Sequence, residues 1–196
     1  MRYNWLALGD SYTIGEGVPL FESYPYQTLE MLRARGLLFD APEIIAKTGW
    51  TTGELLARLE KHTLQPRYDL ITLLIGVNNQ YRGLPIDAYE YELKQLLDLA
   101  KDKGGKIVVI SIPDWGVTPF AAERDQEKIA SELDVYNAIN SRMAGEYGAG
   151  YVDITGIYRE KGALEAMVVE DKLHPSGTMY KVWSDELMKV IAGYFE

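Results

Sequence analysis

Two nearly continuous apolar runs, Leu70 to Ile75 and Ile107 to Ile112, place the strongest constraint on what this chain can fold into. Runs without alternating polar residues are typical of strands covered on both faces, as the central strands of parallel sheets are. Three shorter β-rich runs complete the set: Trp5 to Leu8, Ile44 to Ala46 and Tyr151 to Ile154. Segments of helical period separate the runs, which is typical of parallel strands joined by helical crossovers.

This alternation predicts an α/β fold. We expect a three-layer α/β/α sandwich around a five-stranded, mostly parallel sheet. No internal repeat, low-complexity tract or linker divides the sequence, so one domain over residues 1–196 is expected. The order of the strands stays open at this stage.

The predicted helices have apolar stripes and recognisable ends. Thr51 and Glu54 have the spacing of a capping box before a helix that carries Leu55, Leu56 and Leu59. The other helical segments are Tyr24 to Arg35 with Gly36 past its end, Ile86 to Ala100 before Gly104 and Gly105, Ile129 to Met143, and Tyr180 to Ile191 in a helix that Pro175 is expected to open near its first turn.

Composition removes several kinds of chemistry. The chain has no Cys, which excludes disulfides, thiolate metal sites and a cysteine nucleophile. Only His62 and His174 are available, so a histidine-rich metal site is excluded as well, and a metal would have to be a hard cation held by carboxylates. We expect neither a metal nor a cofactor.

The charge balance bears on partners. Lys and Arg total 20 against 29 Asp and Glu, a formal net charge of -9, which repels nucleic acid and anionic lipid. No cluster of Lys and Arg forms a basic stripe, so no nucleic-acid partner is expected. No apolar run approaches the ~20 residues of a membrane span, and the chain reaches Asp10 too soon for the apolar region of a secretory signal. We therefore expect no stable membrane insertion and a cytoplasmic location; the oligomeric state is left open.

In a parallel sheet the loops after the strands form the ligand-binding edge, and three of these loops carry small polar residues. The sequence Gly9-Asp10-Ser11-Tyr12 follows the first strand, Gly49 lies after the second, and Gly76-Val77-Asn78-Asn79 follows the third. Each has an ordinary alternative: Ser11 could cap a helix, Gly49 could be a turn glycine, and Asn78 could form an Asx turn.

Asp171-Lys172-Leu173-His174 precedes the last helix. An Asp three residues before a His can reach Nδ1 and leave Nε2 free as a base. Alternatively, both residues are solvated loop residues that cap the C-terminal helix. His62, after Lys61 at the end of an amphipathic helix, is interpreted as structural.

Together these segments supply a nucleophile, a base, an orienting carboxylate and N–H donors, the parts needed for acyl transfer through an oxyanion. On these motifs, which span nearly the whole chain, the sequence resembles the SGNH, or GDSL-type, family of esterases and lipases, whose fold is a flavodoxin-like sandwich. The resemblance implies Ser11 as nucleophile, His174 as general base and Asp171 as its orienter. It also implies an oxyanion hole built from the backbone N–H groups of Ser11 and Gly49 and the side-chain amide of Asn78.

Two positions depart from the family's usual pattern. The family most often has Leu where Tyr12 stands and Asp where Asn79 stands. The second departure leaves open how the loop of Asn78 is held.

The expected function is a serine hydrolase that cleaves carboxylic esters through an acyl-enzyme, without a cofactor. Small-molecule esters with short acyl or acetyl groups are favoured, because no apolar insertion resembles a lid. Trp50, Tyr81 and Trp115 are candidates for substrate binding, unless they only cover the ends of the core.

Three alternatives stay open. Within the family, the chain could be a carbohydrate O-acetyl esterase or a lysophospholipase. In another class, it could be a non-catalytic flavodoxin-like domain that binds phosphate or flavin. The spacing of its glycines argues against that last alternative, because it fits neither a dinucleotide fingerprint nor a Walker motif.

Overall fold

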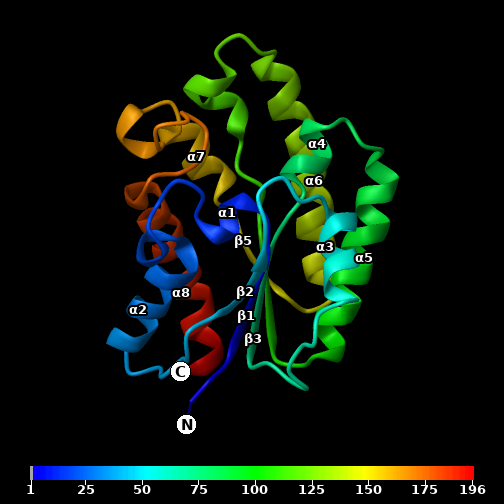
Figure 1. Cartoon of the computed structure of the whole chain (residues 1–196), viewed down its shortest axis with the longest axis vertical. Coiled ribbons are helices and arrows are strands. Elements are labelled where there is room, and N and C mark those ends of the chain that lie inside the picture. The colour runs from blue at the N-terminus through cyan, green and yellow to red at the C-terminus, as the bar shows by residue number, and fades with distance from the viewer. Residues whose placement is uncertain (1) are drawn as a thin grey trace.

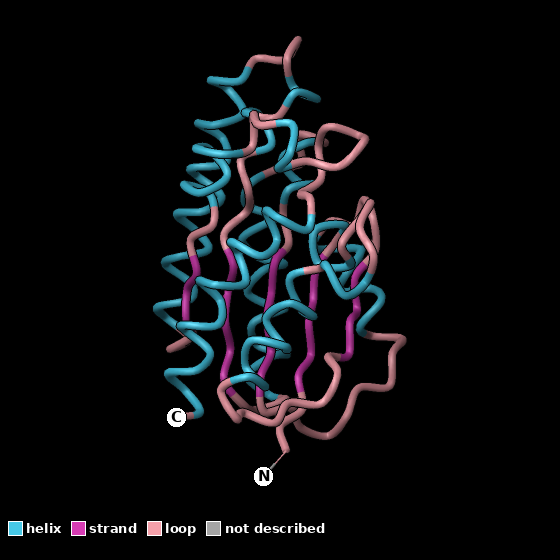
Figure 2. The backbone as a smooth tube through the Cα atoms, turned by 90° about the vertical axis from the view of Figure 1, so that its left-hand side faces the viewer, coloured by secondary structure: helices cyan, strands magenta, loops and turns pink. Residues whose placement is uncertain are grey.

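The structure is a computed structural model that describes residues 2–196. Its centre is a sheet of five strands in the order β2-β1-β3-β4-β5, in which every neighbouring pair is parallel (Figures 1 and 2). The strands are β1 (Trp5–Gly9), β2 (Glu43–Ala46), β3 (Leu70–Leu74), β4 (Lys106–Ile110) and β5 (Gly150–Val152). All five lie within the apolar runs predicted from the sequence or within two residues of them, so the α/β fold class is confirmed.

Helices cover both faces of this sheet (Figure 1). The five long helices are α2 (Tyr24–Ala34), α3 (Thr52–Leu59), α5 (Ile86–Asp102), α6 (Gln126–Glu146) and α8 (Gly177–Phe195). Helices α2 and α8 lie side by side on one face, and α3, α5 and α6 lie on the other. The buried side chains of the sheet and of both helical layers form one continuous apolar cluster, which gives the sandwich a single core.

Short helices interrupt the loops. They are α1 (Ser11–Ile14), α4 (Val77–Tyr81) and α7 (Thr155–Lys161), together with the 3₁₀ turns η1 (Leu20–Glu22), η2 (Trp115–Val117), η3 (Pro119–Ala121) and η4 (Glu165–Met167). Segments of three to seven residues are too short to show an amphipathic period, which is why the sequence pattern did not predict them.

The helix-end predictions hold with one correction. The capping box of α3 is present: the Glu54 N–H donates to Thr51 Oγ1 at 3.3 Å, and the Thr51 N–H donates to Glu54 Oε2 at 2.9 Å. The prediction that Pro175 opens the last helix is wrong. Ser176 is the N-cap of α8, and Pro175 lies before it in an isolated bridge with Val168.

The sheet topology fixes where a ligand site can form. Strand β1 lies between β2 and β3, so the chain runs outward from β1 in both directions along the sheet. In open parallel sheets a crevice forms at this reversal, outside the carboxyl ends of the strands. The segments that follow β1 and β3, with Ser11 and Asn78, meet there. Within residues 2–196, no helix is long and apolar enough to cross a membrane.

Candidate active site

Ser11 is placed by a tight turn at the end of β1. Gly9 is the last residue of the strand, and a Cβ at this position would overlap Thr13 and the backbone of Leu74. Asp10 is the N-cap of α1, because its Oδ1 accepts the N–H of Tyr12 at 3.0 Å. Ser11 is therefore the first residue of α1 and lies at the carboxyl edge of the sheet.

The hydroxyl of Ser11 begins a chain of three side chains. Its Oγ lies 2.9 Å from His174 Nε2, and His174 Nδ1 lies 2.5 Å from Asp171 Oδ2. Ser11 and His174 are 163 residues apart in the sequence, and the fold brings them into direct contact. The tautomer with a hydrogen on Nδ1 satisfies the carboxylate and leaves Nε2 as the acceptor for the serine proton.

Asp171 is held by its own turn. Its Oδ1 accepts the N–H groups of Leu173 and His174 at 2.8 and 2.9 Å. Lys172 within this turn has a φ of 63°, the only non-glycine residue with positive φ in the described chain. Partial burial opposes the charge of Asp171, but the hydrogen bonds from the His174 ring and the two backbone N–H groups outweigh it and hold the pKa of the carboxylate below its ordinary value.

Gly49 and Asn78 line the same cavity as Ser11 and His174. Gly49 has a φ of 85°, a left-handed conformation that favours glycine, and its carbonyl accepts Arg82 Nη2 at 2.5 Å. Asn78 Nδ2 donates one hydrogen to the carbonyl of Trp50 at 2.9 Å. Because an amide nitrogen carries two hydrogens, the second can serve an oxyanion in the cavity.

The two departures from the usual motif have structural explanations. The ring of Tyr12 is buried against His174, with ring centroids 5.4 Å apart, and against Trp183 at 6.1 Å. Asn79 is buried and bonds to both the backbone and the hydroxyl of Thr52. The loop of Asn78 is thus tied to the first turn of α3.

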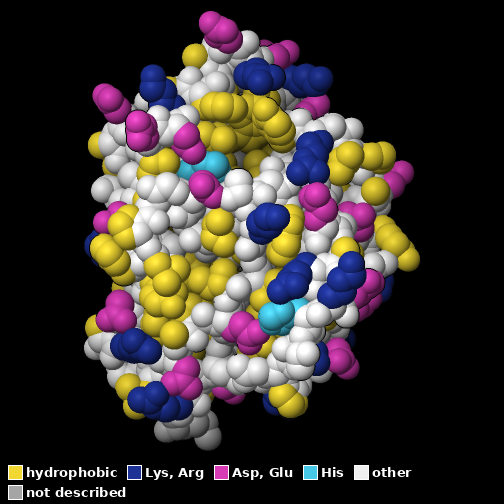
Figure 3. Space-filling model, viewed as in Figure 1, with side chains coloured by type: hydrophobic (Ala, Val, Ile, Leu, Met, Phe, Trp, Pro, Cys, Tyr) yellow, Lys and Arg dark blue, Asp and Glu magenta, His cyan; other side chains and the backbone are white. Residues whose placement is uncertain are grey.

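The cavity beside Ser11 has a volume of about 220 Å³. Its walls are mostly apolar, and its lining residues are Ser11, Tyr12, Thr48, Gly49, Val77, Asn78, Tyr81, Trp115, Phe120, Leu173 and His174. Figure 3 shows hydrophobic side chains gathered beside the upper of the two histidines in that view.

Three aromatic rings form one wall of the cavity. The Trp115 ring lies 5.3 Å from that of Tyr81 and 6.2 Å from that of Phe120, measured between centroids. Tyr81 and Trp115, two of the candidates for substrate binding, both line the cavity. Trp50, the third candidate for substrate binding, packs its side chain against the core and is not among the residues that line the cavity. The contribution of Trp50 to the site is its backbone carbonyl, which accepts a hydrogen bond from Asn78 Nδ2.

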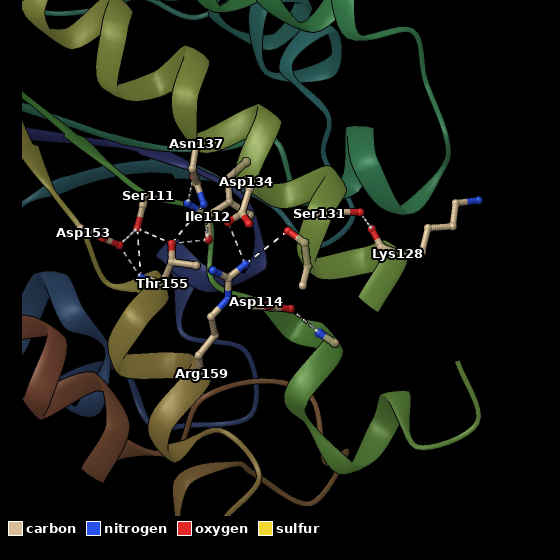
Figure 4. A network of polar contacts seen from close by, with 12 residues as sticks. Ser111, Ile112, Asp114, Lys128, Ser131, Asp134, Asn137, Asp153, Thr155 and Arg159 are labelled. Atoms are coloured by element: carbon tan, nitrogen blue, oxygen red, sulfur yellow. Dashed lines mark hydrogen bonds and ion pairs between the residues drawn. The ribbon is translucent and has the colours of Figure 1, made fainter. Parts of the chain in front are cut away.

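Trp115 is part of the cavity wall, and the polar network in Figure 4 holds the segment that carries it. Asp114 Oδ1 accepts the N–H of Gly116 at 3.0 Å and so caps η2, while its Oδ2 accepts Arg159 Nε at 2.8 Å. Arg159 Nη2 also reaches Asp134 of α6 at 2.8 Å. The segment that carries Trp115 is therefore fixed to both α6 and α7.

His62 is far from this site and makes structural contacts. It lies beyond the end of α3 at Leu59, and its Nε2 is 3.1 Å from Glu43 Oε1. Among residues 2–196, no three His, Asp or Glu side chains converge in a way that could hold a metal ion.

Asp10 is a fully buried carboxyl group directly before Ser11. Loss of hydration disfavours the charged form of Asp10, whereas the hydrogen bond from the Tyr12 N–H favours it. The loss of hydration is the larger effect and raises the pKa of Asp10 to about 7. Between about pH 4 and 7 the folded chain therefore holds a proton here that an unfolded chain releases. The free energy of unfolding should fall as the pH rises through this range.

We expect Asp10→Asn to remove this pH dependence, because asparagine keeps the oxygen that caps α1 and does not titrate. Urea unfolding of the two proteins at pH 5 and pH 8 measures it. The gain in stability of the variant over the wild type should be larger at pH 8, by roughly 2 to 3 kcal/mol. An equal difference at both pH values would contradict the buried titration of Asp10.

A parallel α/β/α sandwich with a hydrogen-bonded serine, histidine and aspartate at its carboxyl edge is an arrangement that serine hydrolases use. The sequence model of the GDSL-like Lipase/Acylhydrolase family matches residues 7–182. The chain belongs to this family, whose members are carboxylic ester hydrolases.

Curated relatives agree with this membership. An arylesterase of Vibrio mimicus is 33% identical over 115 residues, which cover 57% of this chain and 56% of the relative. An acetylxylan esterase of Geobacillus stearothermophilus is 27% identical over 66% of this chain and 62% of its own length. The chain thus spans between half and two thirds of the length of these two relatives. The spore germination lipase LipC of Bacillus licheniformis is 25% identical over 99% of this chain and 98% of its own length.

Solved structures share the fold. The acetylxylan esterase Axe2 of Geobacillus stearothermophilus superimposes with a TM-score of 0.77 at 21% identity, covering 96% of this chain and 94% of Axe2. TesA superimposes with a TM-score of 0.74 at 18% identity, covering 96% of this chain and 97% of that one. The three-layer sandwich is therefore a fold that this chain shares with Axe2 and TesA.

Proposed function

We propose that this protein hydrolyses carboxylic esters through an acyl-serine intermediate, with Ser11 as nucleophile, His174 as general base and Asp171 as its orienting carboxylate. One observation carries the proposal: Ser11 Oγ, the His174 ring and Asp171 form an unbroken hydrogen-bonded chain, and its serine end opens into an apolar cavity. Binding of phosphate or flavin does not require a hydrogen-bonded serine, histidine and aspartate.

The proposed reaction has two steps. His174 Nε2 takes the proton of Ser11 as Oγ bonds to the carbonyl carbon of the ester, and the carbonyl oxygen becomes an oxyanion. The backbone N–H groups of Ser11 and Gly49 and the free hydrogen of Asn78 Nδ2 stabilise that charge. His174 then donates its proton to the departing alcohol, and the carbon–oxygen bond of the ester breaks.

Water completes the cycle. His174 Nε2 takes a proton from a water molecule as the water oxygen attacks the acyl carbon, and a second oxyanion forms in the same hole. The bond between the acyl carbon and Ser11 Oγ breaks, the serine oxygen regains the proton from His174, and the acid leaves. Asp171 stabilises the charged imidazole in both steps.

The cavity suits a small apolar group. Within residues 2–196, no Asp, Glu, Lys or Arg side chain lines it, so acyl groups that carry a charge would lose hydration without gaining an ion pair. We propose small esters with short acyl or aromatic groups as the substrate class. The names of the relatives, an arylesterase and an acetylxylan esterase, support this class.

A fluorophosphonate probe and p-nitrophenyl acetate test the proposal together. The wild type should be labelled once and should release p-nitrophenol, and Ser11→Ala should abolish both signals while the melting temperature stays near that of the wild type. An acetylated xylo-oligosaccharide, assayed by acetate release, separates sugar deacetylation from general ester hydrolysis. A folded wild type that is neither labelled nor active would exclude the proposed function.

The wall of the cavity predicts a shift in acyl preference. Across p-nitrophenyl esters of increasing chain length, kcat/KM of the wild type should peak at short acyl groups. Trp115→Ala removes a buried ring from the wall and should move the peak to longer chains, because the enlarged cavity accepts more methylene groups.

Two variants control this experiment. Trp115→Phe keeps an aromatic wall and should keep the wild-type peak, and Phe120→Ala alters only the half-exposed rim and should shift it less. An unchanged profile in a folded Trp115→Ala variant would show that the acyl group lies elsewhere.

A further inference from the structure

A chain of three hydrogen-bonded polar residues lies next to the loop that carries Gly49. It consists of Asn79 in α4, Thr52 at the start of α3 and Glu92 in α5. The Thr52 N–H donates to Asn79 Oδ1 at 3.0 Å, Asn79 Nδ2 donates to Thr52 Oγ1 at 2.7 Å, and the Thr52 hydroxyl donates to Glu92 Oε2. Asn79 is 1% exposed and Thr52 is fully buried, so the links between them are shielded from solvent.

The direction of each hydrogen bond in this chain is determined. A backbone N–H can only donate, so the oxygen of the Asn79 amide must face Thr52 N and the NH₂ group must face the hydroxyl. The hydroxyl oxygen thus accepts from Asn79, and its single hydrogen is left for a further acceptor. Glu92 provides that acceptor. An amide at position 79 and a carboxylate at position 92 are therefore complementary.

The surrounding backbone leaves room for Glu92 to reach Thr52. A Cβ added at Gly53 would lie 2.8 Å from Glu92 Oε1, so a side chain there would displace the carboxylate. Glycine next to Thr52 lets Glu92 cross from α5 to the first turn of α3. The three residues come from three elements, and the contact joins all of them.

The hydrogen-bonded residues Asn79, Thr52 and Glu92 affect the distance between two oxyanion donors. Gly49 belongs to the β2–α3 loop, and Asn78 belongs to α4, so their donors lie on different segments. Side-chain hydrogen bonds connect these segments at three places: Asn78 Nδ2 to the Trp50 carbonyl at 2.9 Å, Asn79 to Thr52, and Arg82 Nη2 at the end of α4 to the Gly49 carbonyl. Because oxyanion donors act through their placement, a change in the second link moves one donor relative to the other.

We propose that Asn79 and Glu92, acting through Thr52, are positioning residues for the oxyanion hole. The assignment rests on the proposed ester hydrolysis. Neither residue lines the cavity or touches a reacting atom. Both hold the loop of Gly49 against the helix of Asn78, and the pairing of amide with carboxylate sets the direction of the hydrogen bonds that do so.

Exchanging the two groups tests the assignment. In Asn79→Asp, two carboxylates compete for the one hydroxyl hydrogen of Thr52, and kcat for p-nitrophenyl acetate should fall about 10- to 100-fold with KM changed less than about threefold. Glu92→Gln keeps an acceptor for the hydroxyl and should lower kcat no more than about threefold.

The double variant Asn79→Asp/Glu92→Gln restores a complete chain with the hydrogens reversed. The carboxylate at position 79 then accepts from both the N–H and the hydroxyl of Thr52, and the amide at position 92 donates to the hydroxyl oxygen. We expect kcat to return to within about threefold of the wild type.

Controls separate positioning from folding and from charge. Glu90 lies in the same helix as Glu92, but its carboxylate bonds to Arg142 and not to the loop of Gly49. Glu90→Gln combined with Asn79→Asp should therefore not restore kcat. Melting temperatures show whether each variant is folded. Thr52→Ser keeps the hydroxyl and should keep kcat, which provides a second measurement if Asn79→Asp does not fold.

The outcomes are distinct. An inactive wild type would exclude the proposed function and this assignment with it. An active wild type whose kcat is unchanged by Asn79→Asp, or whose loss is not rescued by Glu92→Gln, would overturn the positioning role alone. Loss of kcat in Thr52→Ser despite its hydroxyl would overturn it as well.

Discussion

Replacement of His174 by alanine is expected to lower kcat for p-nitrophenyl acetate by about 10⁴- to 10⁶-fold. The Nε2 atom of this ring lies 2.9 Å from Ser11 Oγ, and no other base contacts that hydroxyl in the described chain. Without it the serine proton has no acceptor and the leaving alcohol has no donor, so both steps slow. Steady-state kinetics with a purified, folded variant measure the loss.

Two comparisons make this prediction specific. Ser11→Ala and the double variant Ser11→Ala/His174→Ala should be about as slow as His174→Ala, because residues that act as one unit are not additive. His62→Ala, which alters the other histidine of the chain, should keep wild-type kcat because it contacts Glu43 far from the cavity. Residual activity within tenfold of the wild type in His174→Ala would show that another group acts as base.

The sheet and the long helices could be predicted from the sequence because their signals are local. The apolar runs of β3 and β4 and the capping box at Thr51 each depend on neighbouring residues alone. Strand order could not be predicted in this way, since it depends on which strands pair across long stretches of sequence. The observed order also explains the site, because it makes β1 and β3 neighbours.

The separate parts of the site were visible as short motifs, and the residues that support them were not. Arg82 follows Asn79 by three positions and looks like an ordinary surface cation, yet it donates to the carbonyl of Gly49. Glu92 lies within a helix whose sequence shows only amphipathic spacing. Such residues carry no local signal, because their partners are about 30 to 40 positions away in the sequence.

Trp50 and Phe120 show the same limit for side-chain direction. Both are aromatic and both lie in loops at the carboxyl edge of the sheet, so a sequence pattern treats them alike. In the structure Trp50 packs against the core, whereas Phe120 is 41% exposed and borders the cavity. The direction depends on the backbone of each loop. The Gly49 φ of 85° and the 3₁₀ turns η2 and η3 are not encoded in any periodicity.

The oxyanion hole leads to the second large effect. Asn78→Ala is expected to lower kcat by about 10²- to 10³-fold, with KM changed much less, since the lost hydrogen bond forms mainly as negative charge develops on the substrate oxygen. The variant also loses the link to the Trp50 carbonyl at 2.9 Å, so the position of Gly49 changes as well.

Asn78→Asp separates these two contributions from a simple loss of volume. The carboxylate has the shape of the amide but carries no hydrogen, and it repels both the Trp50 carbonyl and an oxyanion in the cavity. Its kcat should therefore be at least as low as that of Asn78→Ala. The Ser11–His174 hydrogen bond does not involve Asn78, so the base itself stays in place in both variants. Equal kcat values for the wild type and Asn78→Asp would mean that the side chain of Asn78 does not contact the oxyanion, and the charge would then rest on the backbone N–H groups of Ser11 and Gly49 alone.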